Sequence, residues 1–151
     1  MRLNLDQEIP HEVVERIEQG YHEYVVNKKP LEYILGHVDF FGVPFYVNEH
    51  TLIPRPETEY MITAVSEHLE GVNGTGRLLD IGTGCGVLGI SVLLQNPDFF
   101  KEVYFSDISP EALEVAKRNY KSLIEEGKGF STQAHFLQAN LADFMQQSYT
   151  P

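Results

Sequence analysis

Glycines crowd the stretch LLDIGTGCGVLGIS, residues 78–91, in an arrangement suited to binding chemistry. An apolar run that predicts a strand leads into Asp80. Gly82, Gly84 and Gly86 come next, before an apolar segment that predicts a helix. Ligands of α/β sheets bind beyond the carboxyl ends of the strands, and glycines there allow backbone conformations and close approaches that a Cβ would prevent. The stretch therefore predicts a small-molecule pocket, since a plain strand-to-helix turn needs fewer glycines.

Two classes of ligand fit this glycine turn. Gly84, Gly86 and Gly89 satisfy the G-x-G-x-x-G pattern of dinucleotide sites. Asp107 follows at about the 20-residue spacing of an acid that holds a ribose. In contrast, a carboxylate at Asp80 would repel a pyrophosphate at the mouth of the turn, whereas it would attract the ammonium and sulfonium groups of S-adenosylmethionine. We favour S-adenosylmethionine as the cofactor on this ground, with a nicotinamide dinucleotide as the alternative.

Asp107 and Asn140 extend the predicted pocket to two further strand ends. Asp107 directly follows a strand predicted at 102–106, and Asn140 follows a strand predicted at 134–138. If right-handed βαβ units make these strands neighbours, Asp107 would bind the ribose hydroxyls and Asn140 would offer its amide near the adenine. The alternative interpretation is an ordinary loop acid and a turn residue.

Hydrophobic periodicity divides the chain into elements. Apolar residues recur at helical spacing after Pro10, and aromatic and β-branched residues surround Gly42, which predicts a β-hairpin. The predicted elements are helices at 9–28, 57–69, 86–95 and 110–126, a hairpin within 33–53, and strands at 77–81, 102–106 and 134–138. Because strands and helices alternate from residue 77, we expect an α/β fold with parallel strands. We divide the chain into an N-terminal helix at 1–29, a hairpin linker at 30–56 and a ligand-binding domain at 57–151.

Composition and charge argue against several classes of protein. The formal charge of −11, from 22 acids and 11 bases, is unfavourable for a nucleic-acid partner. We find no apolar run of membrane-spanning length and no secretory signal, so we expect a cytoplasmic protein without a membrane partner. Cys85 is the only cysteine, which excludes an intrachain disulfide and makes us expect no metal site. We expect its thiol to pack inside the turn.

Two further stretches carry a family resemblance. PLEYILGHVDFFGVPFYVNEHTLIPRPETE, residues 30–59, precedes the glycine turn, and FSDISPEALEVAKRN, residues 105–119, follows it. Together with the turn they resemble the HemK-type protein N5-glutamine methyltransferases, which modify the GGQ glutamine of peptide-chain release factors. The LIPRPETE segment separates that family from generic methyltransferases.

This resemblance implies a fold and a set of site residues. The fold would be the N-terminal part of a Rossmann-like class I S-adenosylmethionine-dependent methyltransferase fold, preceded by a helix and a β-hairpin. By resemblance, the residues around the methionine part of the donor are Asp80, Gly82, Gly84 and Gly86. Asp107 would take the ribose hydroxyls, and Asn140 would lie beside the adenine, where many relatives carry an acid. Arg55, Pro56 and Glu57 would line the wall between the hairpin and the donor pocket.

The sequence also departs from the family pattern. The catalytic Asn-Pro-Pro-Tyr signature does not occur before the chain stops at Pro151, so the catalytic residues are unknown. Relatives carry a longer N-terminal helical domain. In the family the strands of the sheet lie in the order 3-2-1-4-5-7-6. A chain that ends after the third strand would leave the first strand, at 77–81, as an apolar edge of the sheet. We therefore expect a fragment of a longer enzyme, or a chain whose edge is covered by a second copy or another polypeptide. An inactive donor-binding or interaction module is the alternative.

Overall fold

The computed structural model describes residues 9–125 and 132–140, which divide into two compact units, 1–35 and 36–151. Residues 1–8, 126–131 and 141–151, which belong to the predicted domains 1–29 and 57–151, lie outside the described residues, as does the last residue of the helix predicted at 110–126.

The first unit consists of two helices, α1 (His11–Val25) and α2 (Leu31–Leu35). Helix α1 has no buried residue, and its apolar side chains, including Ile17 and Tyr21, are exposed. Helix α2 corrects the prediction of extended chain from residue 33. Pro30 precedes it, in a position that proline tolerates because a helix start needs no N–H donor there. The Pro30 carbonyl accepts hydrogen bonds from the backbone N–H groups of Tyr33 and Ile34.

The second unit opens with the predicted β-hairpin. Strand β1 (His37–Phe40) pairs antiparallel with β2 (Val43–Tyr46). The two-residue turn between them has positive φ at both positions, 50° at Phe41 and 73° at Gly42, which matches the twist of a tight hairpin. Phe40 and Phe45 are buried and meet edge to face at 6.2 Å. The short η1 (Pro56–Thr58) then leads into α3 (Glu59–Leu69).

A parallel sheet forms the centre of the second unit. Its strands are β3 (Gly76–Ile81), β4 (Phe100–Asp107) and β5 (Gln133–Gln138), in the order β3-β4-β5 among the described residues. Helix α4 (Val87–Gln95) connects the first two strands. Helix α5 (Pro110–Tyr120), continued by the π-helical η2 (Lys121–Glu125), leads toward the third. The alternation and the parallel pairing confirm the predicted α/β arrangement.

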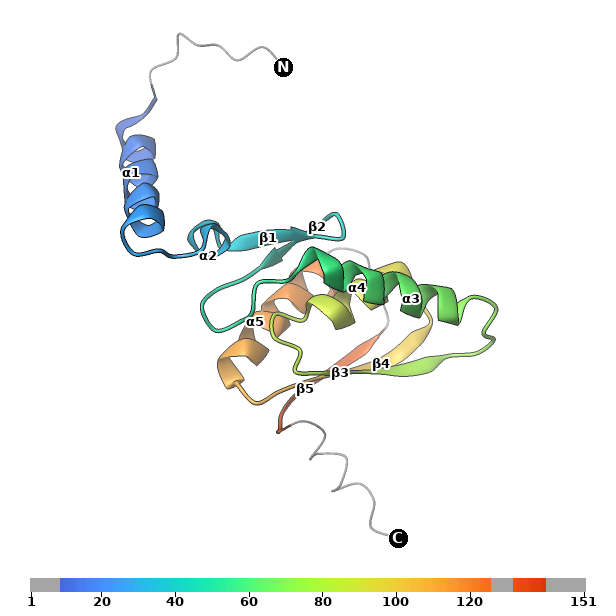
Figure 1. The fold of residues 1–151 in the computed structure, drawn as a ribbon. Coiled ribbons are helices and arrows are strands. Elements are labelled where there is room, and N and C mark those ends of the chain that lie inside the picture. The colour runs from blue at the N-terminus through green and yellow to red at the C-terminus, as the bar shows by residue number, and fades with distance from the viewer. Residues whose placement is uncertain (1–8, 126–131, 141–151) are drawn as a thin grey trace, which may run out of the picture. The chain divides into compact units, whose positions relative to one another are not determined.

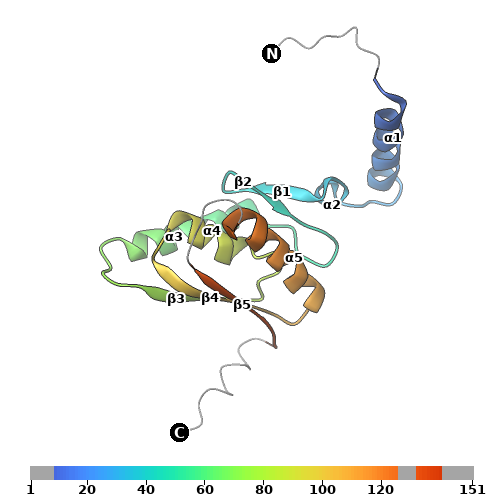
Figure 2. The same cartoon turned by 180° about the vertical axis from the view of Figure 1, so that it is seen from behind.

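Helices α3, α4 and α5 all lie on one side of this sheet, as both views show (Figures 1 and 2). Phe105 is fully buried under them and contacts Tyr120 of α5 and Phe136 of β5. Helix α5 begins as predicted, with Ser109 as N-cap accepting a hydrogen bond from the backbone of Ala112 at 3.1 Å. Among the described helices, none is long and apolar enough to cross a membrane.

Candidate binding site at the strand ends

The glycine turn lies between β3 and α4, at the carboxyl edge of the sheet. The backbone N–H groups of Gly82 and Thr83 both donate to the carbonyl oxygen of Ser106 in β4, at 2.8 and 3.0 Å. Gly82, Gly84 and Gly86 have φ values of 69°, 56° and 83°, which side chains with a Cβ rarely adopt. The three glycines are therefore required by the path of the backbone.

Asp107 lies beside this turn, as expected from the parallel pairing of β3 and β4. Its Oδ2 accepts the backbone N–H of Gly84 at 2.9 Å, and its Oδ1 accepts that of Ser109 at 3.0 Å. The carboxylate thus joins the glycine turn to the N-terminus of α5. A carboxylate oxygen can accept a second hydrogen bond, so both oxygens keep capacity for a hydroxyl group.

Asp80 lies deeper than the sequence argument assumed. Its side chain is only 8% exposed, and Oδ2 accepts hydrogen bonds from the Thr83 hydroxyl at 2.7 Å and from the Gly89 backbone at 3.0 Å. Burial raises the pKa of Asp80, and these two hydrogen bonds act in the opposite direction. Instead of standing at the mouth of the turn, the carboxylate lies under the first turn of α4.

Gly89 accounts for the depth of Asp80. A Cβ at this position would lie 2.5 Å from Cε1 of Phe105 and 3.0 Å from Oδ2 of Asp80. The glycine therefore lets α4 pack directly onto the sheet, which is the packing role of the third glycine in G-x-G-x-x-G. This role concerns the packing of helix on strand and not the ligand. The match to G-x-G-x-x-G therefore does not favour a dinucleotide over S-adenosylmethionine.

Cys85 packs inside the turn, as predicted. It is 2% exposed, and burial raises the pKa of its thiol to about 11. A nucleophilic cysteine needs a thiolate near neutral pH, so this thiol is unsuited to covalent catalysis. Within residues 9–125 and 132–140, no three His, Cys, Asp or Glu side chains gather as a metal site.

The other predicted site residues are more exposed. Asn140 follows β5, and the N–H of its neighbour Ala139 donates to the carbonyl oxygen of Asp107 at 3.0 Å, which brings Asn140 to the same sheet edge. Arg55, Pro56 and Glu57 are exposed and lie immediately before α3. The described contacts do not join these three side chains to the glycine turn, so their predicted role stays a prediction.

Sequence reasoning missed two residues that fix the surroundings of the turn. Asn119 of α5 is 3% exposed and hydrogen-bonds the backbone of both Tyr46 and Cys85. Glu59 accepts the backbone N–H of Phe41 at 2.8 Å, at the tip of the hairpin. The one available signal was that Asn119 falls within the apolar stripe of α5, where a buried amide needs hydrogen-bond partners.

The comparisons with known proteins agree with this arrangement. The profile of the methyltransferase small domain family matches residues 58–149, which include the glycine turn, Asp80, Asp107 and Asn140. The chain belongs to the methyltransferase small domain family. The match confirms the resemblance to methyltransferases that the sequence motifs carry.

Individual relatives of this methyltransferase-family chain carry a more specific name. A release factor glutamine methyltransferase of Bacillus anthracis is 42% identical over 123 residues, covering 80% of this chain and 42% of that protein. A protein of the same name from Flavobacterium psychrophilum is 45% identical over 94 residues, covering 61% of this chain and 32% of that protein. The chain thus spans less than half the length of these relatives.

Among solved structures, a SAM-dependent methyltransferase from Agrobacterium tumefaciens is similar in fold. The TM-score is 0.56 at 16% identity, over 74% of this chain and 34% of the other. At this identity the similarity concerns the fold alone. It confirms the predicted Rossmann-like α/β architecture of the methyltransferase domain.

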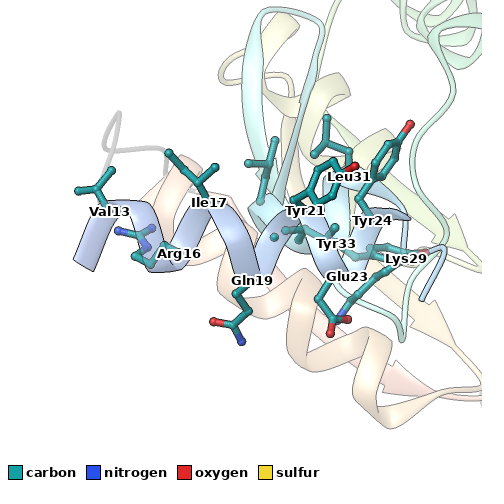
Figure 3. Close-up of a pocket in the computed structure, with 13 residues that line it drawn as sticks. Val13, Arg16, Ile17, Gln19, Tyr21, Glu23, Tyr24, Lys29, Leu31 and Tyr33 are labelled. Atoms are coloured by element: carbon teal, nitrogen blue, oxygen red, sulfur yellow. The ribbon is translucent and has the colours of Figure 1, made fainter. Parts of the chain in front are cut away.

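A hollow of about 990 Å³ lies elsewhere, in the first unit (Figure 3). It is formed by α1, α2 and the segment between them, and side chains such as Ile17, Tyr21 and Tyr33 line it. None of the predicted site residues belongs to it. We therefore keep the strand ends of the second unit as the candidate site.

Proposed function

We propose that this chain binds S-adenosylmethionine at the strand ends and forms the donor-binding part of a methyltransferase that acts on the glutamine of peptide-chain release factors. The relatives that share 42–45% identity with it carry that activity in their names. The Asn-Pro-Pro-Tyr signature does not occur in residues 1–151. Because the chain spans less than half the length of these relatives, we assign donor binding to it and methyl transfer to a longer polypeptide that contains it, in the cytoplasm.

The observation that carries the choice of donor is the contact between Asp80 and α4. Dinucleotide sites place a pyrophosphate on the free N–H groups at a helix N-terminus. Here Oδ2 of Asp80 already accepts the Gly89 N–H in the first turn of α4. A second anion would lie against this carboxylate, whereas the positive charge of a sulfonium would be attracted to it.

Asp107 suits the ribose of such a donor. Gly84 and Ser109 hold the carboxylate from two sides, so its orientation is set before a ligand arrives. Hydroxyl groups would use the remaining acceptor capacity of its oxygens. Gly82, Gly84 and Gly86 would let the methionine part approach the backbone, and Asn140 would meet the adenine from the end of β5.

S-Adenosylmethionine, when bound, would supply a methyl group on its sulfonium: transfer would form a C–N bond, break the S–C bond, release the neutral thioether S-adenosylhomocysteine and free one proton from the amide nitrogen. An amide nitrogen is a weak nucleophile because its lone pair is delocalised, so precise placement must supply much of the acceleration. The contribution that we propose for this chain is to fix the donor. Arg55, Pro56 and Glu57, just before α3, would form the wall on the side of the protein substrate.

We further propose that another polypeptide segment, or a second copy, covers the edge strand β3. Leu78 and Leu79 are half-buried and Ile81 is 44% exposed, and β3 is an edge of the described sheet. Parallel strands are ordinarily buried, and an exposed apolar edge invites pairing. Light scattering over a range of concentrations tests this proposal, and a monodisperse, well-folded monomer at high concentration would contradict it.

Calorimetric titration of the chain tests the choice of donor. We expect saturable binding of S-adenosylhomocysteine and S-adenosylmethionine, and no heat of binding for NAD at the same concentration. Asp107→Asn should weaken S-adenosylhomocysteine binding at least tenfold, since charge-assisted hydrogen bonds contribute about 1.5–3 kcal/mol. Asp98→Asn is the matched control, because this exposed acid follows α4 at the end away from the turn. Tighter binding of NAD than of S-adenosylhomocysteine would refute the proposal.

A further inference from the structure

The side-chain amide of Asn119 joins three parts of the second unit. Its Oδ1 accepts the backbone N–H of Tyr46 at 2.8 Å, and its Nδ2 donates to the carbonyl oxygen of the same residue at 2.9 Å. Nδ2 also donates to the carbonyl oxygen of Cys85 at 2.8 Å. Both N–H groups and the oxygen of one amide are therefore used. The three bonds connect α5, the last residue of the hairpin and the centre of the glycine turn.

The contact with Cys85 fixes one peptide plane of the turn. In a trans peptide the carbonyl and the following N–H point in opposite directions. The Cys85 carbonyl is held by Asn119, and the N–H of Gly86, on the same peptide, donates to the Thr83 carbonyl at 2.9 Å. The plane is thus held from both sides. Glycine has a wide choice of backbone conformations, so these two hydrogen bonds, one from within the turn and one from α5, stabilise the conformation with φ of 83° at Gly86.

The hairpin is held by the same surface of α5. The guanidinium carbon of Arg118 lies 3.5 Å from the centre of the Tyr46 ring, next along the chain from Asn119. Asn119 binds the Tyr46 backbone as a neighbouring strand would, with one donor and one acceptor. The position of the hairpin end is therefore tied to the same amide that orients the turn.

We propose that Asn119 is a positioning residue for the donor. Its amide fixes the orientation of the Cys85–Gly86 peptide in the glycine turn and holds the end of the hairpin in place next to that turn. The inference rests on the proposed donor site. Asn119 acts through the backbone and does not itself touch the ligand. Donor affinity should therefore depend on the two N–H groups of its amide.

Asn119→Asp is the sharpest variant, because it keeps the shape and the acceptor but removes both donors. We expect S-adenosylhomocysteine affinity to fall at least tenfold at neutral pH. Asn96→Asp is the matched control. Asn96 follows the other end of α4 and likewise donates twice from Nδ2, to Ser66 and to Val92. It should leave the affinity within twofold, measured where circular dichroism shows both variants folded.

The dependence of donor affinity on pH distinguishes a positioning role of Asn119 from a general loss of structure in the variant. Burial and facing carbonyl oxygens should raise the pKa of the introduced carboxyl, which on protonation regains one donor. The affinity of Asn119→Asp relative to that of the unmutated chain should therefore recover as pH falls, while the ratio for Asn96→Asp stays flat. A flat ratio for both variants would overturn the proposal. If Asn119→Asp does not fold, Asn119→Ser, which also loses both amide donors but carries no titrating group, replaces it in the affinity measurement at neutral pH, where a loss of less than twofold would overturn the proposal.

Amide hydrogen exchange gives a readout that needs no donor. Asn119→Asp should speed exchange of the Gly86 amide at least tenfold, Asn119→Ser, which also loses the acceptor of the Tyr46 N–H, should speed exchange of both the Gly86 and Tyr46 amides, and Asn96→Asp should change neither. Unchanged exchange at both amides would overturn the inference whether or not the chain binds a donor. Failure of the unmutated chain to bind S-adenosylhomocysteine, together with the expected exchange, would refute the donor site but keep the coupling of the turn to the hairpin.

Discussion

The two faces of the β3-β4-β5 sheet differ in what covers them. Helices α3, α4 and α5 cover one face (Figure 1). Val103 and Phe105 of β4 are fully buried. On the opposite face Tyr104 stacks on His135 at 4.5 Å, and both are partly exposed. No described helix of the second unit lies on that face (Figure 2). Within the described part of the second unit, the helices therefore cover one face of the parallel sheet and leave the other open.

The largest expected effect comes from the covered face. Phe105→Ala should lower the free energy of unfolding by about 3–5 kcal/mol, because it removes a fully buried ring that packs on Phe136 and Tyr120. Chemical denaturation measures this loss. Tyr104→Ala is the control on the opposite face and should cost clearly less, since Tyr104 is only partly buried. Equal losses would contradict the assignment of the core to one face.

The second largest loss of stability is expected where α4 packs closely on this face of the sheet. Gly89→Ala should cost about 1–3 kcal/mol, because the new methyl group would overlap the Phe105 ring. Ser91→Ala, on the same helix, should be neutral or stabilising, since its buried Oγ has no hydrogen-bond partner in the described part of the chain. Thermal unfolding of both variants checks this order. A Gly89→Ala variant as stable as Ser91→Ala would show that α4 does not pack so closely.

Asp80 makes the covered face sensitive to pH. Its folded pKa is raised above the ordinary 3.8, so the native state binds more protons in the window between 3.8 and the raised value. The free energy of unfolding should therefore decrease as pH rises through that window. Asp80→Asn should remove this part of the pH dependence, which denaturation at several acidic pH values would measure. An unchanged pH profile would mean that Asp80 is better solvated than its burial indicates.

The smallest effect on stability is expected at the uncovered edge. Ile81→Lys should change the free energy of unfolding by no more than about 0.5 kcal/mol, because Ile81 is 44% exposed on an edge strand. The same charge should prevent pairing of this edge and so reduce association in light scattering. A large loss of stability would mean that the described chain itself already covers Ile81.

Local sequence signals predicted much of this fold. Ser109 and Pro110 gave the start of α5, and the parallel pairing of β3 and β4 brought Asp107 to the glycine turn as expected. Cap residues and strand alternation act within a few positions, so a single sequence contains them. The same holds for the hairpin around Gly42, whose glycine has the positive φ that a tight turn requires.

Long-range contacts could not be predicted in this way. The depth of Asp80 depends on how closely Gly89 lets α4 approach Phe105, which is a property of the packed state. The partners of Asn119 lie 34 and 73 positions away in the sequence. Helix α2 was missed because its five residues, LEYIL, give too short a pattern to separate a helical turn from extended chain.

The most direct test of the donor site is a titration of the isotope-labelled chain with S-adenosylhomocysteine, followed by nuclear magnetic resonance. We predict that the amide signals of Gly82, Gly84, Gly86 and Asp107 move with a common saturation curve, while those of α1 and α2 stay in place. Signals that move only around the hollow of the first unit, or no movement at the glycine turn, would contradict the account.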